Sequence, residues 1–435
     1  MYFLNLLPLF VTAVGTFFLV KLRFFFLAHP IRTVKRLKSA VSDKESRRAL
    51  SLALAGTLGV GNIVGVAFGI SVGGAGALFW IFVSGIFSSV IKYAESSLAA
   101  DKKNNASGGM MYVLSSSFKR TGRFFGVIYA LLCLFLSLTM GSALQSQSAI
   151  IGAREIIDIP QYAAAFIFAL AVFAVIVFGV GRIEKATAKI IPVSTIVYIF
   201  LALAVILSNV SLLLPTLAQI FREAFNFKSF GGGVSSFVAI RAMREGYARG
   251  LLSNEAGAGT SSMAQSKSNL KSAEVGLLGI LEVFFDTTLL CTLTGLAVLL
   301  SGADLSCSSG MDIILDAVSN IPLGKLTVTV LICAFAYSTV ICWYYYGCEC
   351  IRFLFGKRRD AAFGALFIFS VYIGFALPGS ILIYASDILL FCMSILTLLA
   401  LIKNSERVVF LSEQYGLLKK SDIGKRGESG ISKQL

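Results

Sequence analysis

Apolar runs of about 20 residues recur along the whole chain, and this pattern limits the folds that the chain can adopt. As an α-helix, a run of that length crosses the hydrocarbon core of a bilayer. Hydrophobic residues make up 57% of the chain and charged residues 14%, against roughly half and a quarter in a typical globular domain. The sequence therefore predicts an all-α integral membrane protein with about eleven transmembrane helices. The expected spans are 3–20, 50–72, 76–100, 124–151, 162–181, 188–208, 232–262, 273–301, 324–352, 360–378 and 381–402.

The positive charge of the chain follows the predicted spans. The formal net charge is +15, and Lys and Arg concentrate in every second connection, whereas residues 301–322 contain neither. Basic residues accumulate in the cytoplasmic loops of membrane proteins. We therefore expect the N-terminus outside and the tail from Lys403 in the cytoplasm, and we attribute the charge to topology rather than to nucleic-acid binding.

Glycines cluster inside two of the predicted spans. The second span contains Gly-Thr-Leu-Gly-Val-Gly-Asn at 56–62, and the seventh opens with three glycines at 231–233 and continues to a Gly-rich run at 253–262. Each glycine costs a helix interior about 1 kcal/mol relative to alanine. Unwound backbone inside a membrane is tolerated where it lines a cavity, and half-helix ends there bind a carboxylate and a cation.

The two breaks stand five spans apart, which predicts two five-helix repeats of opposite topology with a binding site between them. A channel, or a bundle packed tightly on small residues, would also contain such breaks. Gly65, Gly69 and Gly73 fall every four residues, and we interpret them as a stripe for close helix packing. The clustered glycines Gly56, Gly59 and Gly61 are interpreted as part of a site.

Other polar side chains inside the spans are candidate ligands. Ser338 and Thr339 carry neutral oxygens that suit a small alkali cation, although most membrane Ser and Thr bond the preceding turn. Gln145 and Gln147 are expected to face a polar cavity, because a buried amide needs partners. Trp343 lies in the middle of its span rather than at the membrane interface. In this position it could form the wall of a small apolar pocket.

Two carboxylates also lie inside predicted spans. Glu255 is either a functional group, as an ionisable side chain at that depth suggests, or an acceptor for amides freed by the neighbouring glycines. Asp286 is expected to be buried and has no assigned role. An enzyme is not expected: Gly69-Ile70-Ser71-Val72-Gly73 matches a nucleophile motif, but the chain's one histidine, His29, lies in a basic loop, so the required base is missing.

Seven segments together resemble the alanine/glycine:cation symporter family of prokaryotes. They are GTLGVGNIVGVA (56–67), GGAGALFW (73–80), KYAE (92–95), GGMMY (108–112), RGLLSNEAG (249–257), FAYST (335–339) and WYYYG (343–347). The resemblance implies a LeuT-like fold, which is a five-plus-five inverted repeat preceded by one extra helix. It implies the divisions 1–48 (extra helix and basic loop), 49–208 (first repeat), 209–402 (second repeat) and 403–435 (cytoplasmic tail).

The same resemblance implies symport of alanine or glycine with sodium, or in some members with protons, across the prokaryotic cytoplasmic membrane, with no organic cofactor. An uncoupled transporter or channel is the alternative. The implied substrate residues are Gly59, Gly61, Asn62, Gln145, Leu252 and Trp343, and the implied sodium residues are Gly56, Gly59, Ser338 and Thr339. Leu252 stands where the family often has phenylalanine, and Cys342 where it usually has glycine. Both departures bear on the choice between alanine, glycine and another small amino acid.

Overall fold

The computed structural model describes residues 6–103, 108–225, 234–306, 309–356 and 359–418, and all regular structure in these ranges is helical. The helices of the first part are α1 (Leu6–Lys21), α2 (Phe25–Ala28), α3 (Pro30–Ala40), α4 (Lys44–Thr57), η2 (Val60–Asn62), α5 (Val64–Gly73), α6 (Gly76–Asp101), α7 (Met110–Ser117), α8 (Gly122–Leu138), η3 (Thr139–Leu144), α9 (Gln145–Arg154), α10 (Gln161–Ile176), α11 (Val180–Ser208), η4 (Val210–Leu212) and α12 (Leu213–Ala224). Those of the second part are α13 (Val234–Asn254), α14 (Ser262–Gln265), α15 (Ser272–Val283), η5 (Phe284–Cys291), α16 (Thr292–Ser301), α17 (Gly310–Ala317), α18 (Gly324–Phe355), α19 (Asp360–Ile373), η7 (Gly374–Ala376), α20 (Gly379–Lys403) and α21 (Ser405–Gln414). The predicted all-α membrane fold is confirmed.

Six helices of the described residues are long and apolar enough to cross a membrane by themselves: α6, α8–α9, α11, α15–α16, α18 and α20. The pair α4 and η2–α5 passes the same criteria as one span bent by 67°. Three further apolar helices, α1, α10 and α19, are shorter. The expected seventh span corresponds to α13, which is less apolar because it carries Arg241, Arg244, Glu245 and Arg249. The count of about eleven spans therefore stays a prediction.

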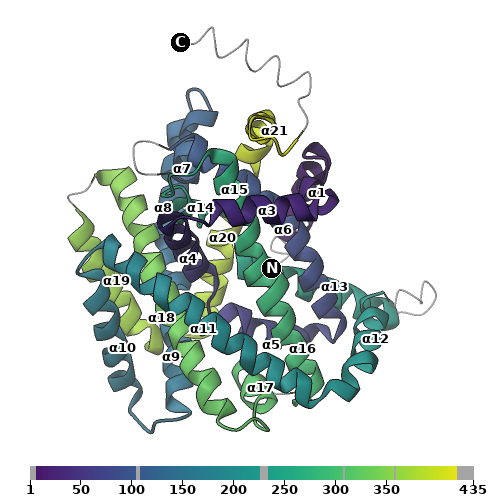
Figure 1. Ribbon diagram of the computed structural model, residues 1–435. Coiled ribbons are helices and arrows are strands. Elements are labelled where there is room, and N and C mark those ends of the chain that lie inside the picture. The colour runs from purple at the N-terminus through teal and green to yellow at the C-terminus, as the bar shows by residue number, and fades with distance from the viewer. Residues whose placement is uncertain (1–5, 104–107, 226–233, 307–308, 357–358, 419–435) are drawn as a thin grey trace.

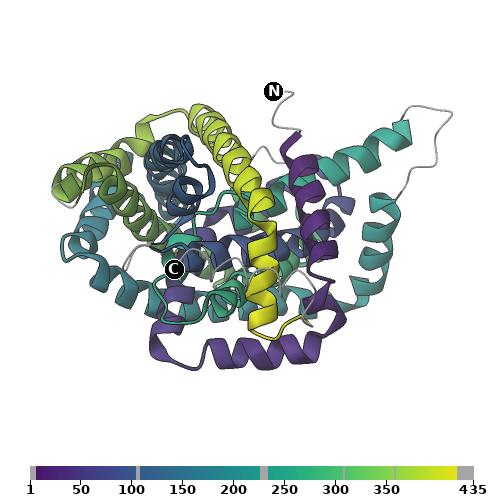
Figure 2. The ribbon, with the colours of Figure 1, turned by 90° about the horizontal axis from the view of Figure 1, so that it is seen from above.

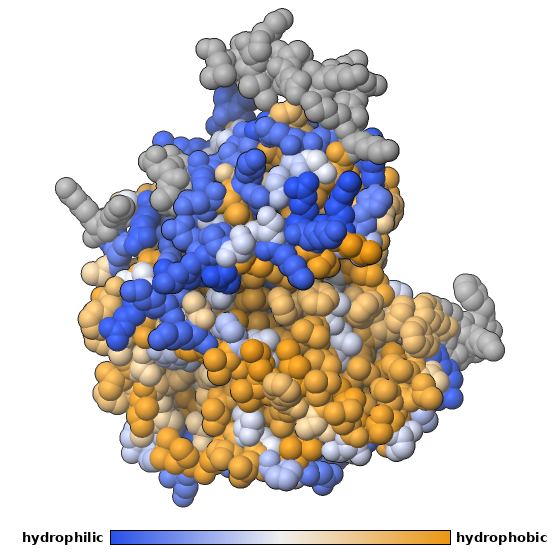
Figure 3. Space-filling model, viewed as in Figure 1, coloured by the Kyte–Doolittle hydropathy of each residue, from blue (hydrophilic) through white to orange (hydrophobic). Residues whose placement is uncertain are grey.

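Polar and apolar residues separate into two zones on the surface. Figure 3 shows hydrophilic residues over the upper part of the molecule and a broad hydrophobic band below it. The upper part contains α3, α7 and α21, which Figure 1 places at that end. This division matches a bundle embedded in lipid with one basic end in water.

The C-terminal helix α21 is docked on the bundle. Arg407 pairs with Asp101 at the end of α6 at 2.6 Å, and the Tyr93 and Ser412 hydroxyls lie 2.7 Å apart. The described part of the expected tail, residues 403–418, therefore consists of the packed helix α21 and a few residues on either side of it. Residues 419–435 lie outside the described residues, and so do the glycines 231–233 of the expected seventh span.

Helix α6 lies at the centre of the bundle and packs on α13 and α15. A Cβ on Gly279 of α15 would come within 2.7 Å of the Lys92 carbonyl of α6, so the two backbones almost touch, as small residues allow in membrane bundles. Figures 1 and 2 show α10 and α19 together at one edge and α12 at the opposite edge.

The expected glycine stripe on α5 packs in part. A Cβ on Gly69 would meet Arg249 Cγ at 2.7 Å, and one on Gly73 would meet Glu245 Cβ at 3.1 Å, both on α13. Gly65 has no such neighbour within 4 Å. The packing interpretation holds for Gly69 and Gly73 and is wrong for Gly65.

Candidate functional site

The first predicted break is present between α4 and α5. The helix α4 ends at Thr57, Gly59 is extended with φ −118° and ψ −161°, and a single 3₁₀ turn at η2 precedes α5. The Gly59 amide donates to Asn62 Oδ1 at 3.1 Å, so the Asn62 side chain closes the turn that the clustered glycines allow. At the other end of α4, the hydrogen bond from Ser46 holds the pKa of the N-cap residue Asp43 below its ordinary value.

Two side chains from other helices enclose Gly59. A Cβ at this position would lie 3.1 Å from Gln145 Oε1 and 3.1 Å from Thr339 Oγ1. The Val60 amide donates to Gln145 Oε1 at 3.4 Å. A side chain at position 59 would meet both groups at less than an ordinary contact distance, so Gln145 and Thr339 would have to shift.

Oxygen atoms converge beside Gly59 on the α18 side. Thr339 Oγ1 is 3.3 Å from the Leu58 carbonyl and 2.9 Å from the Phe335 carbonyl, and Ser338 Oγ is 2.9 Å from the same Phe335 oxygen. Both hydroxyls are buried. The structure thus joins Thr339 to the Leu58 carbonyl of the break, while Ser338 bonds the preceding turn of its own helix and shares the Phe335 oxygen with Thr339.

Gly56 is oriented toward a different neighbourhood. A Cβ there would meet Tyr346 Oη at 2.7 Å and Cys342 Sγ at 3.2 Å, one turn further along α18. Cys342 itself donates to the Leu52 carbonyl at 3.0 Å. The side of Gly56 that would carry a side chain therefore faces Tyr346 and Cys342 rather than Thr339.

The two broken helices meet through Asn62. Its side-chain amide donates to Ser253 Oγ at 2.8 Å and to Asp286 Oδ1 at 2.5 Å. Ser253 and Thr287 each donate to Asp286 Oδ2, at 2.9 and 2.7 Å. All four residues are buried. The expected meeting of the breaks is therefore observed, and Asp286, which had no predicted role, is the acceptor that joins them.

Open space lies next to Gly61. This residue is exposed, and a Cβ on it would meet no atom within 4 Å. Leu252, which is partly buried, precedes Ser253 on α13 and so lies close to Asn62. Gly61 therefore borders the break on its open side, and Leu252 lies next in sequence to the Ser253 that bonds Asn62.

Trp343 is held by the π-helical turn η3. It is fully buried, and a Cβ on Gly141 would come within 2.5 Å of Trp343 Cβ. The same turn leads directly into Gln145, so one irregular segment positions both residues. Gln147 instead donates to the Leu377 carbonyl at 2.8 Å, and the expectation that it faces the cavity with Gln145 is wrong.

The second predicted break follows α13. Glu255, Gly257 and Gly259 have φ values of 53°, 94° and 74°, a left-handed region that favours glycine and strains Glu255. The Gly257 amide donates to Glu95 Oε1 at 2.7 Å, whereas Glu255 Oε2 accepts from the Thr260 hydroxyl. The carboxylate that receives the freed amide is therefore Glu95, which the sequence did not indicate.

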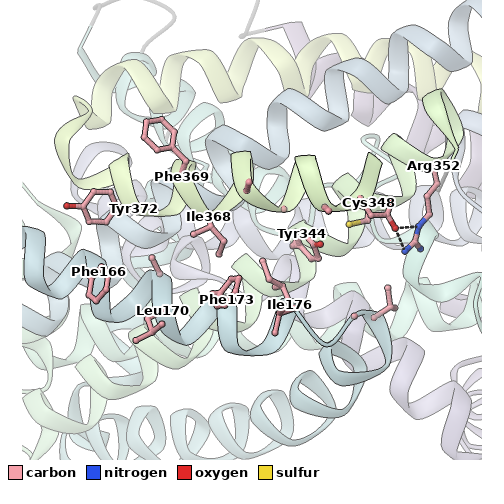
Figure 4. Close-up of a pocket in the computed structure, with 18 residues that line it drawn as sticks. Phe166, Leu170, Phe173, Ile176, Tyr344, Cys348, Arg352, Ile368, Phe369 and Tyr372 are labelled. Carbon is pink, nitrogen blue, oxygen red and sulfur yellow. Dashed lines mark hydrogen bonds and ion pairs between the residues drawn. The ribbon is translucent and has the colours of Figure 1, made fainter. Parts of the chain in front are cut away.

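A cavity of about 930 Å³ lies apart from these residues, between α10, α18 and α19. Figure 4 shows its apolar wall, with Phe166, Leu170 and Phe173 on one side and Ile368 on the other. At one end Arg352 is already paired, with Asp360 at 2.8 Å. Phe166 and Leu170 are exposed, so this cavity opens on the hydrophobic surface and offers no free charge to an amino acid.

Comparison with known sequences gives one consistent result. A profile of the sodium:alanine symporter family matches residues 1–428. The sodium/alanine symporter AgcS of Methanococcus maripaludis is 31% identical over 401 residues, which cover 88% of this chain and 87% of that protein. The probable sodium/glutamine symporter GlnT of Bacillus subtilis is 28% identical over 372 residues, with 82% and 76% covered.

Comparison with solved structures concerns the fold alone. The transporter MhsT in complex with L-phenylalanine aligns with a TM-score of 0.53 at 15% identity, covering 80% of this chain and 87% of that chain. A Na⁺-coupled sialic acid symporter in a substrate-bound outward-open state aligns with a TM-score of 0.52 at 10% identity, covering 93% and 86%. Both likenesses agree with the LeuT-like architecture that the family resemblance implies.

Proposed function

The chain belongs to the sodium:alanine symporter family and is a sodium-coupled amino-acid symporter, and we propose that it takes up a small neutral amino acid, alanine or glycine, by alternating access. It is a multi-pass membrane protein. The finer assignment rests on one observation about the backbone of the break. A Cβ on Gly61 would meet open space, whereas a Cβ on Gly59 would lie between the polar side chains of Gln145 and Thr339.

The substrate carboxylate is proposed to bind the N-terminal end of η2 and α5. The first N–H groups of a helix have no partner within it and carry the positive end of the helix dipole. Gln145 would contact the polar end of the amino acid, and Asn62 would hold the turn in place. Leu252 and Trp343 would enclose the side chain, and with Leu252 in place of a larger ring the pocket suits alanine at least as well as glycine.

The coupling ion is proposed to bind where Ser338 and Thr339 meet the carbonyls of Leu58 and Phe335. These are neutral oxygens, so an alkali cation bound there would keep its charge as it crosses. The membrane potential would then contribute about 2.3 kcal/mol per charge per 100 mV to uptake. Gly59, whose position is bracketed by Thr339 and Gln145, would link cation binding to substrate binding.

Alternating access is proposed to move the repeats 49–208 and 209–402 against each other around this site. The direct bonds between Asn62 of the first repeat and Ser253 and Asp286 of the second support a site at the junction. The N-terminus is proposed to lie outside and the C-terminus in the cytoplasm of a prokaryotic cell, because the basic connections alternate along the chain.

Uptake into proteoliposomes tests the proposal. Labelled alanine should accumulate saturably when a sodium gradient is imposed, and unlabelled glycine should compete with it. Unlabelled glutamine is the informative competitor, because a relative at 28% identity is named as a glutamine carrier. Accumulation driven by a proton gradient in the absence of sodium would contradict sodium as the coupling ion. Flux that never saturates would contradict the symport mechanism.

A further inference from the structure

The buried carboxylates beneath the second break are not used by the proposed transport site. Lys92 and Glu95 project from α6, Glu282 from α15, and Glu255 from the end of α13, and all four are fully or almost fully buried. We call these four residues the Lys92 cluster. Three carboxylates share one ammonium, so the cluster holds an excess of negative charge if all of them are ionised.

Two of the three carboxylates have partners suited to a charged group. Glu282 Oε1 lies 3.2 Å from Lys92 Nζ, and its Oε2 accepts from the Gln265 amide. Glu95 Oε1 accepts the 2.7 Å bond from the Gly257 backbone amide, while its Oε2 has no hydrogen-bond partner among the described residues. Charge-assisted hydrogen bonds of this kind favour the ionised form.

Glu255 has the weakest set of partners. Its Oε2 is bonded only by the Thr260 hydroxyl, which is equally able to accept a hydrogen bond. Its Oε1 is buried and has no hydrogen-bond partner among the described residues. Lys92 Nζ, the nearby cation, is already engaged by Glu282 and by Ser261 Oγ at 2.6 Å. An isolated carboxylate is costly to bury, whereas its protonated form is not.

Within the part of the chain that the structure describes, the surroundings of Glu255 supply no second cation. The titratable or charged groups around Glu255 are Lys92 and Glu95 of α6, Tyr129 of α8, Glu282 of α15, Asp286 of η5, and Cys342 and Tyr346 of α18. Lys92 alone among these groups is positive, and the others are acids. Every neighbouring charge other than Lys92 therefore disfavours an ionised Glu255.

We propose that Glu255 binds a proton in this conformation, and that this proton makes sodium-driven uptake dependent on pH. The neutral carboxyl fits the enclosed site, and ionisation places a further negative charge beside Glu282 and Asp286. Because Glu255 begins the segment 255–261 that joins α13 to α14, losing the proton disfavours the packing of the second break. The cycle then visits this conformation less often at alkaline pH.

The test measures labelled alanine uptake at several pH values, equal inside and outside the proteoliposomes, with a fixed sodium gradient. The inference rests on the proposed uptake function. Wild-type uptake should fall at alkaline pH, because the protonated fraction of one carboxyl decreases about tenfold per pH unit above its pKa. Glu255→Gln, which is neutral at every pH, should transport with a flat profile.

Two further variants keep the test decisive if Glu255→Gln is poorly assembled. Thr260→Val removes the hydroxyl that donates to the Glu255 carboxylate, so the midpoint of the pH profile should move to higher pH. Glu282→Gln removes a negative charge beside Glu255 and leaves Lys92 without its anion, so the midpoint of the pH profile should move to lower pH. A monodisperse protein with sodium-dependent alanine binding shows that each variant is folded.

Several outcomes would overturn the proton site. They are a wild-type profile that Glu255→Gln leaves unchanged, a folded Glu255→Gln that is inactive at every pH, an unmoved midpoint in Thr260→Val, or a midpoint that Glu282→Gln does not lower. Absence of sodium-stimulated uptake by the wild type at all pH values would instead refute the proposed function.

Discussion

The side-chain amide of Asn62 donates a 2.5 Å hydrogen bond to Oδ1 of Asp286, and this bond joins the first broken helix to the π-helical turn η5. Asp286 also accepts from Ser253 and Thr287, so one carboxylate satisfies three buried donors from three parts of the chain. The geometry around the transport site depends on this group.

Asp286→Ala should destabilise the folded protein, because the donors on Asn62, Ser253 and Thr287 would lose a common acceptor. A buried polar group left without its partner costs about 1–3 kcal/mol. Thermal unfolding in detergent measures the effect. Asp158→Ala, at an exposed loop position, serves as the control and should leave the unfolding temperature unchanged. Equal stability of the two variants would contradict the joining role of Asp286.

Gly61→Leu should abolish alanine uptake while the protein still folds. No atom stands within 4 Å of the position of its Cβ, so the leucine side chain would fill the space proposed for the substrate without clashing. Gly181→Leu is the matched control, since Gly181 of α11 is equally open and lies outside the proposed site. Normal uptake by a folded Gly61→Leu would show that the substrate binds elsewhere.

Thr339→Val should weaken the dependence of uptake on sodium. The change keeps the shape of the side chain and removes the hydroxyl that lies between the Leu58 and Phe335 carbonyls. Loss of about 1.4 kcal/mol corresponds to a tenfold higher sodium concentration at half-maximal uptake. Thr16→Val is the control: the Thr16 hydroxyl also bonds a backbone carbonyl one turn earlier, but on the exposed side of α1. An unchanged sodium curve in Thr339→Val would rule out this hydroxyl as a ligand.

Gly141→Ala should displace Trp343, because the new methyl group would lie within 2.5 Å of Trp343 Cβ. Overpacking of this kind typically costs about 1–3 kcal/mol. The chain has two tryptophans, so in a Trp80→Phe background the fluorescence reports on Trp343 alone, and its emission should shift. Gly152→Ala on α9, whose nearest neighbours are at the ordinary distance of 3.5 Å, should leave emission and stability unchanged. An identical spectrum in Gly141→Ala would contradict the proposed contact.

Helix propensities of single residues were enough to predict the breaks. Clustered glycines followed by an asparagine are disfavoured in any helix, whatever surrounds it. The pairing of Gly59 with Gln145 and Thr339 came from the family resemblance, since nothing in single-residue propensities indicates which span faces which. The partner of Asn62 was missed because Asp286 lies 224 residues away. A signal was present in the run Asp286-Thr287-Thr288 inside an apolar span, but a polar run does not name its partner.

Two other errors have a physical cause. Gln147 lies two residues from Gln145 on one helix, about 200° around the helix axis. The two side-chain amides therefore face different surroundings. Gly65 shares the four-residue spacing of Gly69 and Gly73, but the stripe faces α13 only beyond the first turn of α5. Spacing identifies a face of a helix and does not identify how far a neighbouring helix covers it.

The docking of α21 also determines when the contacts of α6 can be completed during synthesis. Asp101 and Tyr93 of α6 emerge from the ribosome 306 and 319 residues before their partners Arg407 and Ser412. The central helix therefore enters the membrane with polar groups whose native partners do not yet exist. Final assembly of the basic end must wait until α21 has been synthesised, and a chain that stops before α21 would leave Asp101 and Tyr93 without these partners.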